Sequence, residues 1–253
     1  MWVSYLINLK ANTDRLANCA RQFDAAGIAW KRVEGVNGWA MTDDEVARVY
    51  SATRNAKDGK HPLVKPEIGC YLSHIEAWRQ IADGPDAGGF IFEDDFRAGA
   101  SLRPAIERLS MRESDWDMVK LFSFDPAPRM VSRRPLGEGL TIGEPYRVPT
   151  CLIGYGVTRE AARRLADTSL PFFRPVDEDM KYFWEKKLRM ALVLPPPIVV
   201  GDQAAQTGTI GDARRTNAAE RRQSAGRAPL HKLIYQLKYA VQLHYHRLWR
   251  PNR

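Results

Sequence analysis

The sequence has few of the features that mark disulfide-rich, zinc-binding or membrane-spanning proteins. Its 253 residues include only three cysteines, which are widely spaced and form no CxxC motif. This pattern excludes a disulfide framework and a zinc ribbon, and it favours reduced thiols in a cytosolic setting. No apolar run approaches the ~20 residues that a membrane-spanning helix needs. Met1 leads directly into a strand-like segment without a basic region or a cleavage site, so we expect no secretory leader.

Acidic residues are scarce near the C-terminus. From Arg214 onward the chain has ten arginines and lysines and a single acid, Glu220. This segment accounts for the formal net charge of +8, because the rest of the chain is nearly charge-balanced. A basic balance indicates an anionic partner, a class that includes nucleic acid, anionic lipid and phosphorylated substrates. We expect a globular body over residues 1–212 and a basic tail over residues 213–253.

The first part of the chain predicts a β-α-β unit. The apolar run over 2–9 is expected to form a strand. Leu16, Cys19 and Phe23 then give the spacing of an amphipathic helix, and residues 28–33 return to strand character. Two strands joined in this way lie parallel, with a right-handed crossover.

The alternation of strands and helices continues along the body. Residues 125–149 are rich in proline, glycine and arginine, and we predict a long loop there. The alternation predicts an α/β class: one domain with a mostly parallel central sheet flanked by helices. We expect further strands at 90–92, 117–122, 151–157, 191–194 and 198–200, and helices that begin near Thr42, Pro66, Leu102 and Thr158.

Three adjacent acids, Glu93, Asp94 and Asp95, follow directly on the apolar run FIF. Ligands of parallel sheets bind at the carboxyl ends of the strands, where these acids are expected to lie. If the extended conformation continues, Glu93 and Asp95 share one face and Asp94 takes the other. Two carboxylates at this spacing suit Mg²⁺ or Mn²⁺, which prefer oxygen ligands. The alternative is an acidic turn that is solvated or paired with Arg97.

A second acidic cluster, Asp177, Glu178 and Asp179, lies in the segment RPVDEDMKYFW. A carboxylate beside a sugar hydroxyl can take its proton as that oxygen attacks, so the cluster is a candidate general base. The alternative is a helix N-terminus that carries acids, which the helix dipole favours.

The chain resembles glycosyltransferase family 25, the lipooligosaccharide and lipopolysaccharide galactosyltransferase family whose relatives include collagen galactosyltransferase domains. The resemblance runs from about Val3 to Met180. It implies a GT-A-like fold, a UDP-galactose or UDP-glucose donor, a divalent metal and inversion at the anomeric carbon. The segments that carry it are, in order, INLKANTDR, KRVEGVNG, KPEIGCYLSHIEAW, FIFEDDFRAG, LIGYGVTREAARRL and PVDEDM.

The resemblance also implies roles for both acidic clusters. The EDD motif stands at the family's metal and diphosphate site, so Asp95 and Asp94 are expected to hold Mn²⁺ or Mg²⁺, with Asp95 as the favoured direct ligand. Glu93 is expected to lie beside the nucleotide sugar. The DED motif is expected to form part of the catalytic centre. A third metal ligand stays open, because Asp202 and Asp212 lie in the right region without a convincing motif.

Further positions in the matched motifs are expected to contact the nucleotide sugar. Each has a structural alternative: capping of the first turn, a hydrogen-bonded core histidine, or an ion pair of a buried lysine with a carboxylate. Cys70 and the histidine four residues later have the spacing to share a metal, but no other soft ligand accompanies them. The positions are Asn8, Arg15, Ser73, His74, Lys120, Gly154 and Tyr155.

The basic tail predicts an amphipathic helix that begins at Pro229. A basic helix with aromatic edges suits adsorption to an anionic membrane surface, and we expect the protein on the inner face of the cytoplasmic membrane. The alternative is a helix that packs on the body or on a second subunit. Its apolar stripe is Leu230, Leu233, Ile234, Leu237, Val241, Leu248 and Trp249, and its cations are Lys232, Lys238, Arg247 and Arg250.

These features predict a cytoplasmic, metal-dependent hexosyltransferase that acts on a lipopolysaccharide, a lipooligosaccharide or a related glycan. A nucleic-acid-binding protein is the competing class, because the net charge is +8. That class lacks a recognisable RNA or DNA motif here and leaves both acidic clusters unexplained, so we expect no nucleic-acid partner. A catalytically silent scaffold is a third class, and the intact acids weigh against it.

Overall fold

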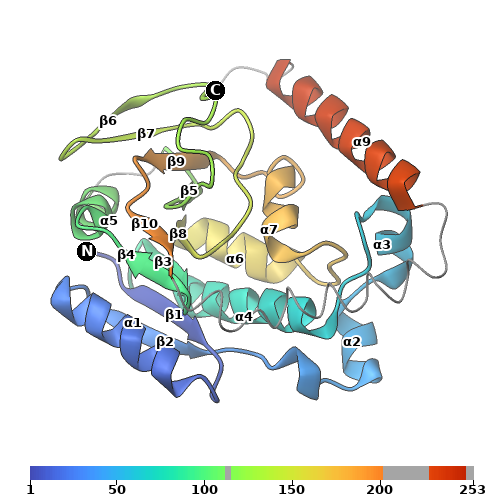
Figure 1. Ribbon diagram of the computed structural model, residues 1–253, viewed down its shortest axis with the longest axis horizontal. Coiled ribbons are helices and arrows are strands. Elements are labelled where there is room, and N and C mark those ends of the chain that lie inside the picture. Colours follow the sequence, from blue (N-terminus) through green and yellow to red (C-terminus); the bar gives the residue numbers. More distant parts are fainter. Residues whose placement is uncertain (112–114, 202–227, 249–253) are drawn as a thin grey trace.

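An eight-stranded sheet crosses the middle of the molecule (Figure 1). The computed structural model describes residues 1–111, 115–201 and 228–248. All strands except β8 and β7 point in one direction, so the sheet is mixed with a mostly parallel orientation. From edge to edge the strands are β2 (Trp30–Glu34), β1 (Ser4–Asn8), β3 (Gly88–Glu93), β8 (Gly154–Thr158), β5 (Met118–Lys120), β9 (Met190–Leu194), β7 (Leu140–Gly143) and β6 (Arg134–Gly137).

Helices cover both faces of the sheet, as predicted for an α/β protein (Figure 1). One face carries α4 (Lys65–Ala82), α6 (Arg159–Thr168), α7 (Val176–Asp179), the 3-10 turn Met180–Tyr182 and α9 (Ala228–Leu248). The other face carries α1 (Thr13–Ala25) and α5 (Leu102–Ser110). The segment between β2 and α4 forms a 3-10 turn at Gly38–Ala40 and the short helices α2 (Asp43–Val49) and α3 (Ala52–Asp58).

The predicted β-α-β opening is confirmed. β1 and β2 pair in parallel, and α1 between them buries Cys19 and Phe23, two members of its predicted stripe. The central strand β3 alternates between the two cores: Phe90 and Phe92 pack with α1 and α5, whereas Ile91 packs with α4 and α6. Alternation with a period of two is what a strand buried on both faces requires.

The prediction of an uninterrupted loop over 125–149 is wrong. Strands β6 and β7 form a hairpin there, and β7 pairs with β9, so the hairpin extends the sheet. Its turn passes through Gly137, Glu138 and Gly139, all with positive φ. Pro135 is tolerated because β6 is the edge strand, where a missing N–H breaks no ladder hydrogen bond. Proline and glycine, which are typical of loops, here form an edge strand and its turn.

The acidic cluster does not continue in an extended conformation, and the alternative of an acidic turn describes its backbone. Strand β3 ends at Glu93, and Asp94 and Asp95 form a turn into β4 (Phe96–Ala98). β4 leaves the main sheet and pairs with β10 (Ile198–Val200). Positions in this cluster therefore follow from the turn and not from strand alternation.

Helix α9 packs on the body through an aromatic face. Tyr235, Tyr239 and Leu243 are buried in the same core as α4 and α6. The ring of Tyr239 meets that of Tyr182 edge-on, with 5.2 Å between the centroids. No helix in the described part of the chain has the length and apolarity that a membrane crossing requires.

One cation of the expected basic face is placed differently. Arg247 was expected beside the exposed apolar stripe, but its side chain is buried and pairs with Glu144. It also donates to the carbonyl oxygen of Tyr146 at 3.0 Å. A buried, paired arginine fastens the end of α9 to the body and contributes little to surface charge. Of the other predicted tail residues, the side chains of Leu230 and Lys232, and all of Trp249 and Arg250, lie outside what the structure describes.

Candidate active site

The first acidic cluster lies where β1 and β3 end side by side. Asn8, the last residue of β1, donates from Nδ2 to Asp94 Oδ2 at 2.7 Å. Arg15, on the first turn of α1, forms an ion pair with Asp94 Oδ1 at 2.7 Å. The two predicted turn residues thus hold both oxygens of Asp94 and fix the conformation of the turn. Asp94 is neutralised by protein groups.

Asp95 has a different environment. Its Oδ1 is buried and has no hydrogen-bond partner among the described residues, and its Oδ2 lies 3.9 Å from the Arg15 guanidinium. Burial, together with the negative charge of Glu93, raises the pKa of Asp95 to about 7. A buried carboxylate oxygen without a partner is costly, and a divalent cation would satisfy it. The residues present therefore fit Mn²⁺ or Mg²⁺ at Asp95.

Glu93 ends a hydrogen-bond relay that passes through the core. Trp78 Nε1 donates to the hydroxyl of Tyr155 at 2.8 Å, and this hydroxyl lies 2.8 Å from His74 Nδ1. His74 Nε2 lies 3.1 Å from Glu93 Oε1. An ionised carboxylate only accepts, so Nε2 of His74 carries a proton and donates it to Glu93. Burial acts to raise the pKa of Glu93, but the hydrogen bond from His74 and the positive charges of His74, Lys120 and Arg15 together outweigh it, and the pKa is lowered.

Several residues predicted to contact the nucleotide sugar are fully buried behind the wall of the site. Ser73 accepts from the N–H of Val36 at 2.8 Å and donates to the carbonyl of Gly69 at 2.7 Å. Lys120 donates to the carbonyl oxygen of Cys151. In this arrangement these buried side chains support the pocket wall from behind. Direct contact with a donor stays a prediction. The buried residues are Ser73, His74, Lys120 and Tyr155.

Gly154 is required by packing between strands. A Cβ added there would lie 2.2 Å from Cδ1 of Ile198, on β10, and 3.1 Å from a ring carbon of Phe92, on β3. Core side chains therefore approach the backbone closely at Gly154. Whether a sugar also lies beside its backbone stays a prediction.

The acids of the DED motif on α7 have three different environments. Glu178 pairs with Lys60 at 3.5 Å and with Lys181 at 3.0 Å, and it accepts from the hydroxyl of Tyr235 at 3.1 Å. These partners neutralise Glu178 and connect it to α9.

Of the three acids, Asp179 forms the most buried ion pair. It pairs with the buried Arg174 at 3.1 Å and accepts from the hydroxyl of Tyr71 at 2.7 Å. Asp177, by contrast, accepts only from backbone N–H groups, those of Cys151 at 3.3 Å and Glu178 at 2.9 Å. Among the described residues no basic nitrogen lies within 4 Å of Asp177. Asp177 is therefore the acid of the motif that can take up a proton without breaking an ion pair.

Both acidic clusters border one pocket of about 420 Å³. Glu93 lines it from the end of β3, and Asp177 and Glu178 line it from α7. Cys70 also lines the pocket. Burial raises the pKa of its thiol well above the ordinary value, and the negative charges of Glu93, Asp177 and Asp95 raise it further, so acids of both clusters lie near this thiol. Carboxylates from two distant parts of the sequence therefore surround one space.

The pocket also has a buried cation behind it. Burial lowers the pKa of Lys120 to about 8, although Asp177 and Glu93 act in the opposite direction. Cys70, His74 and Glu93 place their ligand atoms within 4.8 Å of one another, so a carboxylate joins the pair considered from the sequence. Thiol and imidazole ligands suit Zn²⁺, whereas Mn²⁺ and Mg²⁺ prefer oxygen ligands. For Mn²⁺ or Mg²⁺ the carboxylate of Asp95 is therefore the better site.

Sequence reasoning missed part of the wall. Phe124 and Thr150 line the pocket from positions that flank the predicted loop over 125–149, and Cys151, with φ of 70°, lies beside Asp177. Their signal was weak, because a residue that precedes a strand carries no periodic pattern. The candidates for a third metal ligand, Asp202 and Asp212, lie outside the described residues.

Comparisons with known proteins point to one family. The model of glycosyltransferase family 25, described as LPS biosynthesis protein, matches residues 1–180. Procollagen galactosyltransferase 1-A of Xenopus laevis is 28% identical over 194 residues, which cover 72% of this chain and 31% of the relative. Procollagen galactosyltransferase 1 of Danio rerio is 26% identical over 226 residues, covering 79% and 37%. A human relative named inactive glycosyltransferase 25 family member 3 is 25% identical over 191 residues, covering 72% and 31%.

The chain thus spans about a third of the length of these relatives. The region that the family model matches ends at Met180, directly after the second acidic cluster. It includes Glu93 and Asp177, which line the pocket, and Asp95, which belongs to the same acidic turn as Glu93. This chain belongs to glycosyltransferase family 25.

Proposed function

We propose that this protein is an inverting, metal-dependent hexosyltransferase with a GT-A-type fold. One observation carries the proposal: a single pocket is bordered by Glu93, from an acidic turn at the end of a central strand, and by Asp177, from a second acidic motif. An inverting displacement needs a cation for the leaving diphosphate and a base for the attacking hydroxyl. The first cluster supplies carboxylates for the cation, and the second supplies a carboxylate for the base.

Asp95 is the proposed metal ligand, because its buried Oδ1 has no partner in the described part of the protein. A bound Mn²⁺ or Mg²⁺ would neutralise the diphosphate of the donor. Asp94, the second predicted ligand, is held by Arg15 and Asn8 and supports the turn from behind. Glu93, oriented by His74, adds negative charge beside Asp95 and strengthens the site for a cation.

Asp177 is the proposed general base. Its carboxylate lies on the pocket wall without a cationic partner among the described residues, and two backbone N–H groups fix its orientation. It would accept the proton of the acceptor hydroxyl as that oxygen attacks the anomeric carbon. Glu178 and Asp179 hold α7 in place through their ion pairs, and their role is to position Asp177.

The proposed donor is UDP-galactose, and the proposed acceptor is a lipopolysaccharide, a lipooligosaccharide or a related glycan. The relatives named procollagen galactosyltransferases and the family description LPS biosynthesis protein support this choice. UDP-glucose is the alternative donor.

We further propose that the protein works at the inner face of the cytoplasmic membrane, where a lipid-linked acceptor would be presented. Helix α9 supports this, because the face opposite its packed tyrosines is apolar and exposed to solvent. An exposed apolar stripe of this kind suits adsorption to a lipid surface. The stripe comprises Leu233, Ile234, Leu237, Val241, Tyr245 and Leu248, which are 44–65% exposed.

Thermal unfolding with a panel of nucleotides and nucleotide sugars, with and without Mn²⁺, tests the proposal. We expect UDP and UDP-galactose to raise the melting temperature only when Mn²⁺ is present, because ligands that bind the native state stabilise it. Stabilisation by UDP-glucose and not by UDP-galactose would identify UDP-glucose as the donor. No response to any nucleotide in the presence of Mn²⁺ would overturn the proposed function.

A further inference from the structure

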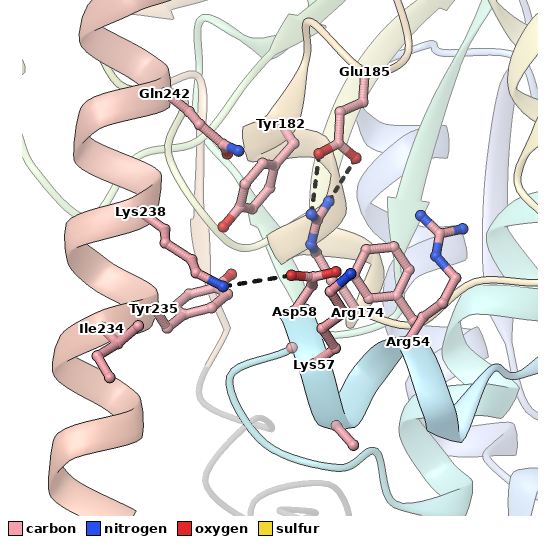
Figure 2. A pocket seen from close by; sticks show the side chains of 13 residues that line it. Arg54, Lys57, Asp58, Arg174, Tyr182, Glu185, Ile234, Tyr235, Lys238 and Gln242 are labelled. Atoms are coloured by element: carbon pink, nitrogen blue, oxygen red, sulfur yellow. Dashed lines mark hydrogen bonds and ion pairs between the residues drawn. The ribbon is translucent and has the colours of Figure 1, made fainter.

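A second pocket, of about 380 Å³, lies between α3, α9 and the segment that runs from Phe173 to Glu185 (Figure 2). No residue lines both this pocket and the one that holds Glu93 and Asp177. The proposed transfer reaction makes no use of it. Its lining is charged on one side and continuous with the exposed face of α9 on the other.

Cations outnumber acids on the wall of this second pocket. Two of the four cations have acidic partners. Arg174 pairs with Glu185 through two contacts of 2.8 and 3.1 Å. Lys238 reaches from α9 toward Asp58 on α3 at 3.6 Å, and this solvent-exposed pair is weak (Figure 2). The charges of the lining residues sum to +2, from Arg54, Lys57, Arg174 and Lys238 against Asp58 and Glu185, and Asp179 behind the wall also pairs with Arg174.

Two cations on α3 have no acidic partner. The guanidinium of Arg54 lies over the ring of Phe173, 4.2 Å from its centroid, which holds the charge at the pocket. No carboxylate of the described residues lies within 4 Å of Arg54 or of Lys57. A pocket that gathers uncompensated positive charge is electrostatically suited to an anion.

A buried donor on the wall supports the same conclusion. Arg174 is only 4% exposed, yet its Nε has no hydrogen-bond acceptor within the described part of the structure. A buried donor without an acceptor costs free energy, and an anionic oxygen in the pocket would supply one.

The pocket is continuous with the exposed apolar stripe of α9. Ile234 lies on the pocket wall and also belongs to that stripe, and Lys238 follows one turn later. Leu237 and Val241 extend the stripe along the helix, 64% and 61% exposed. A ligand with an anionic head and an apolar tail would satisfy the cations and cover the stripe together.

We infer that this pocket binds the phosphate headgroup of an anionic membrane phospholipid, whose acyl chains lie along the exposed stripe of α9. The inference rests on the proposed membrane association and names the site that would select the lipid. It also places the lipid surface beside α7, because Tyr235 lines this pocket and donates to Glu178 of the DED motif.

Sedimentation with vesicles tests the headgroup contact. The full chain should bind phosphatidylcholine vesicles that contain phosphatidic acid more tightly than vesicles of phosphatidylcholine alone. The double variant Arg54→Gln/Lys57→Gln should bind the acidic vesicles roughly 30-fold more weakly, since each cation near an anionic surface contributes about 1 kcal/mol. Lys31→Gln, which removes an exposed lysine of β2, is the matched control and should bind like the wild type. Equal binding by the double variant and the wild type would overturn the inference.

The apolar contact is tested with Leu237→Ser/Val241→Ser. Both side chains are exposed, so the substitutions should not affect folding, and binding to the acidic vesicles should fall at least tenfold. Inorganic phosphate serves as the probe for a free anion. If phosphate stabilises the protein against heat while acidic vesicles do not bind, the site takes a soluble anion and the lipid assignment is wrong. If sedimentation velocity shows a dimer that Leu237→Ser/Val241→Ser dissociates, the stripe is covered by a second copy and the inference is also wrong.

A parallel measurement separates this inference from the proposed transferase function. Stabilisation by UDP with Mn²⁺ should be the same in the wild type and in Arg54→Gln/Lys57→Gln. If the wild type does not bind acidic vesicles but is still stabilised by UDP with Mn²⁺, the headgroup site is wrong and the proposed function stands. Vesicle binding that depends on Arg54 and Lys57, without any response to UDP, would support the headgroup site and remove the proposed function.

Discussion

At the scale of single residues, three adjacent carboxylates have different properties because their partners differ. Glu93 accepts from His74, Asp94 is held by Arg15 and Asn8, and Asp95 keeps a buried oxygen without a partner in the described structure. The sequence motif EDD does not reveal this difference. It arises because the chain turns after Glu93 and directs each side chain to a different neighbour.

Asp95→Asn should stabilise the metal-free protein at pH 8 and have little effect at pH 4. The folded-state pKa of Asp95 is raised to about 7 from an ordinary value of 3.8, by burial and by Glu93. The native state therefore binds this proton more tightly than the unfolded chain, and stability falls as pH rises between these values. The loss is on the order of 2–4 kcal/mol, and the amide removes it.

Urea unfolding with a chelator present, at both pH values, measures this effect. Asp167→Asn, an exposed acid on α6, is the control and should leave stability unchanged within about 0.5 kcal/mol at either pH. An equal effect of Asp95→Asn at pH 4 and pH 8 would contradict the assignment. The same variant should also lose its Mn²⁺-dependent stabilisation by UDP.

Asp177→Asn should lower kcat for sugar transfer by about 10²–10⁴-fold, because a general base contributes that much to a proton transfer. Donor binding should persist, since the amide keeps the shape of the side chain. Glu178→Gln, on the same helix, is the comparison: it loses its charge but not a proton-transfer role, so kcat should change less. Steady-state kinetics together with UDP stabilisation separates the two variants. A larger loss of kcat in Glu178→Gln than in Asp177→Asn would identify Glu178 as the general base.

At the scale of elements, the packing of Gly154, on β8, against side chains of β3 and β10 sets the shape of the wall behind the pocket. Gly154 leaves room for Ile198 and Phe92, and β10 holds β4, which continues the turn that carries Asp95. The path from Gly154 to the acidic turn thus runs through core contacts. A substitution at this glycine acts on the site through the position of β10.

Gly154→Ala should destabilise the fold by about 1–3 kcal/mol, because overpacking a buried contact costs that much. Ile198→Val removes the carbon that the new Cβ would meet at 2.2 Å, and alone it should cost about 0.5–1.5 kcal/mol. The double variant should be more stable than the sum of the two single effects predicts. Urea unfolding of all four proteins gives the coupling free energy, and strict additivity would show that Ile198 is not the obstacle.

At the scale of the whole molecule, α9 is part of the body although it follows a basic segment. Its tyrosines enter the core of α4 and α6, Tyr235 contacts Glu178, and Arg247 pairs with Glu144. The division into a body over residues 1–212 and a tail over residues 213–253 stays a prediction about sequence composition. In space, the helix of the tail contacts the DED motif through the hydrogen bond from Tyr235 to Glu178.

A chain that ends at residue 212 should be less stable than the full chain by on the order of 3–6 kcal/mol. The reason is that Tyr235, Tyr239 and Leu243 are buried, at about 1.5–3 kcal/mol for each large apolar side chain, reduced by the entropy that the helix regains. Urea unfolding measures the difference. Leu237→Ser in the full chain is the control, because its side chain faces solvent and the stability should not change. A truncated chain with full stability would show that the tail is an independent element.

The sequence by itself determined the order of most strands and helices, the position of both acidic clusters and the family. Alternation, helical spacing and capping are local properties, and they can be read over a few residues. The hairpin β6–β7 was missed because an edge strand tolerates the proline and glycine that usually mark a loop.

Only the tertiary structure decided which acid has a free oxygen, which acid lacks a cation and which face of α9 is buried. Asp95 differs from Asp94, and Asp177 from Asp179, because of partners that lie far away in the sequence, such as Arg15 and Tyr71. The pKa of a carboxylate depends on desolvation and on charges within a few ångströms. Those neighbours are set when the chain folds, so the same residue types acquire different chemistry.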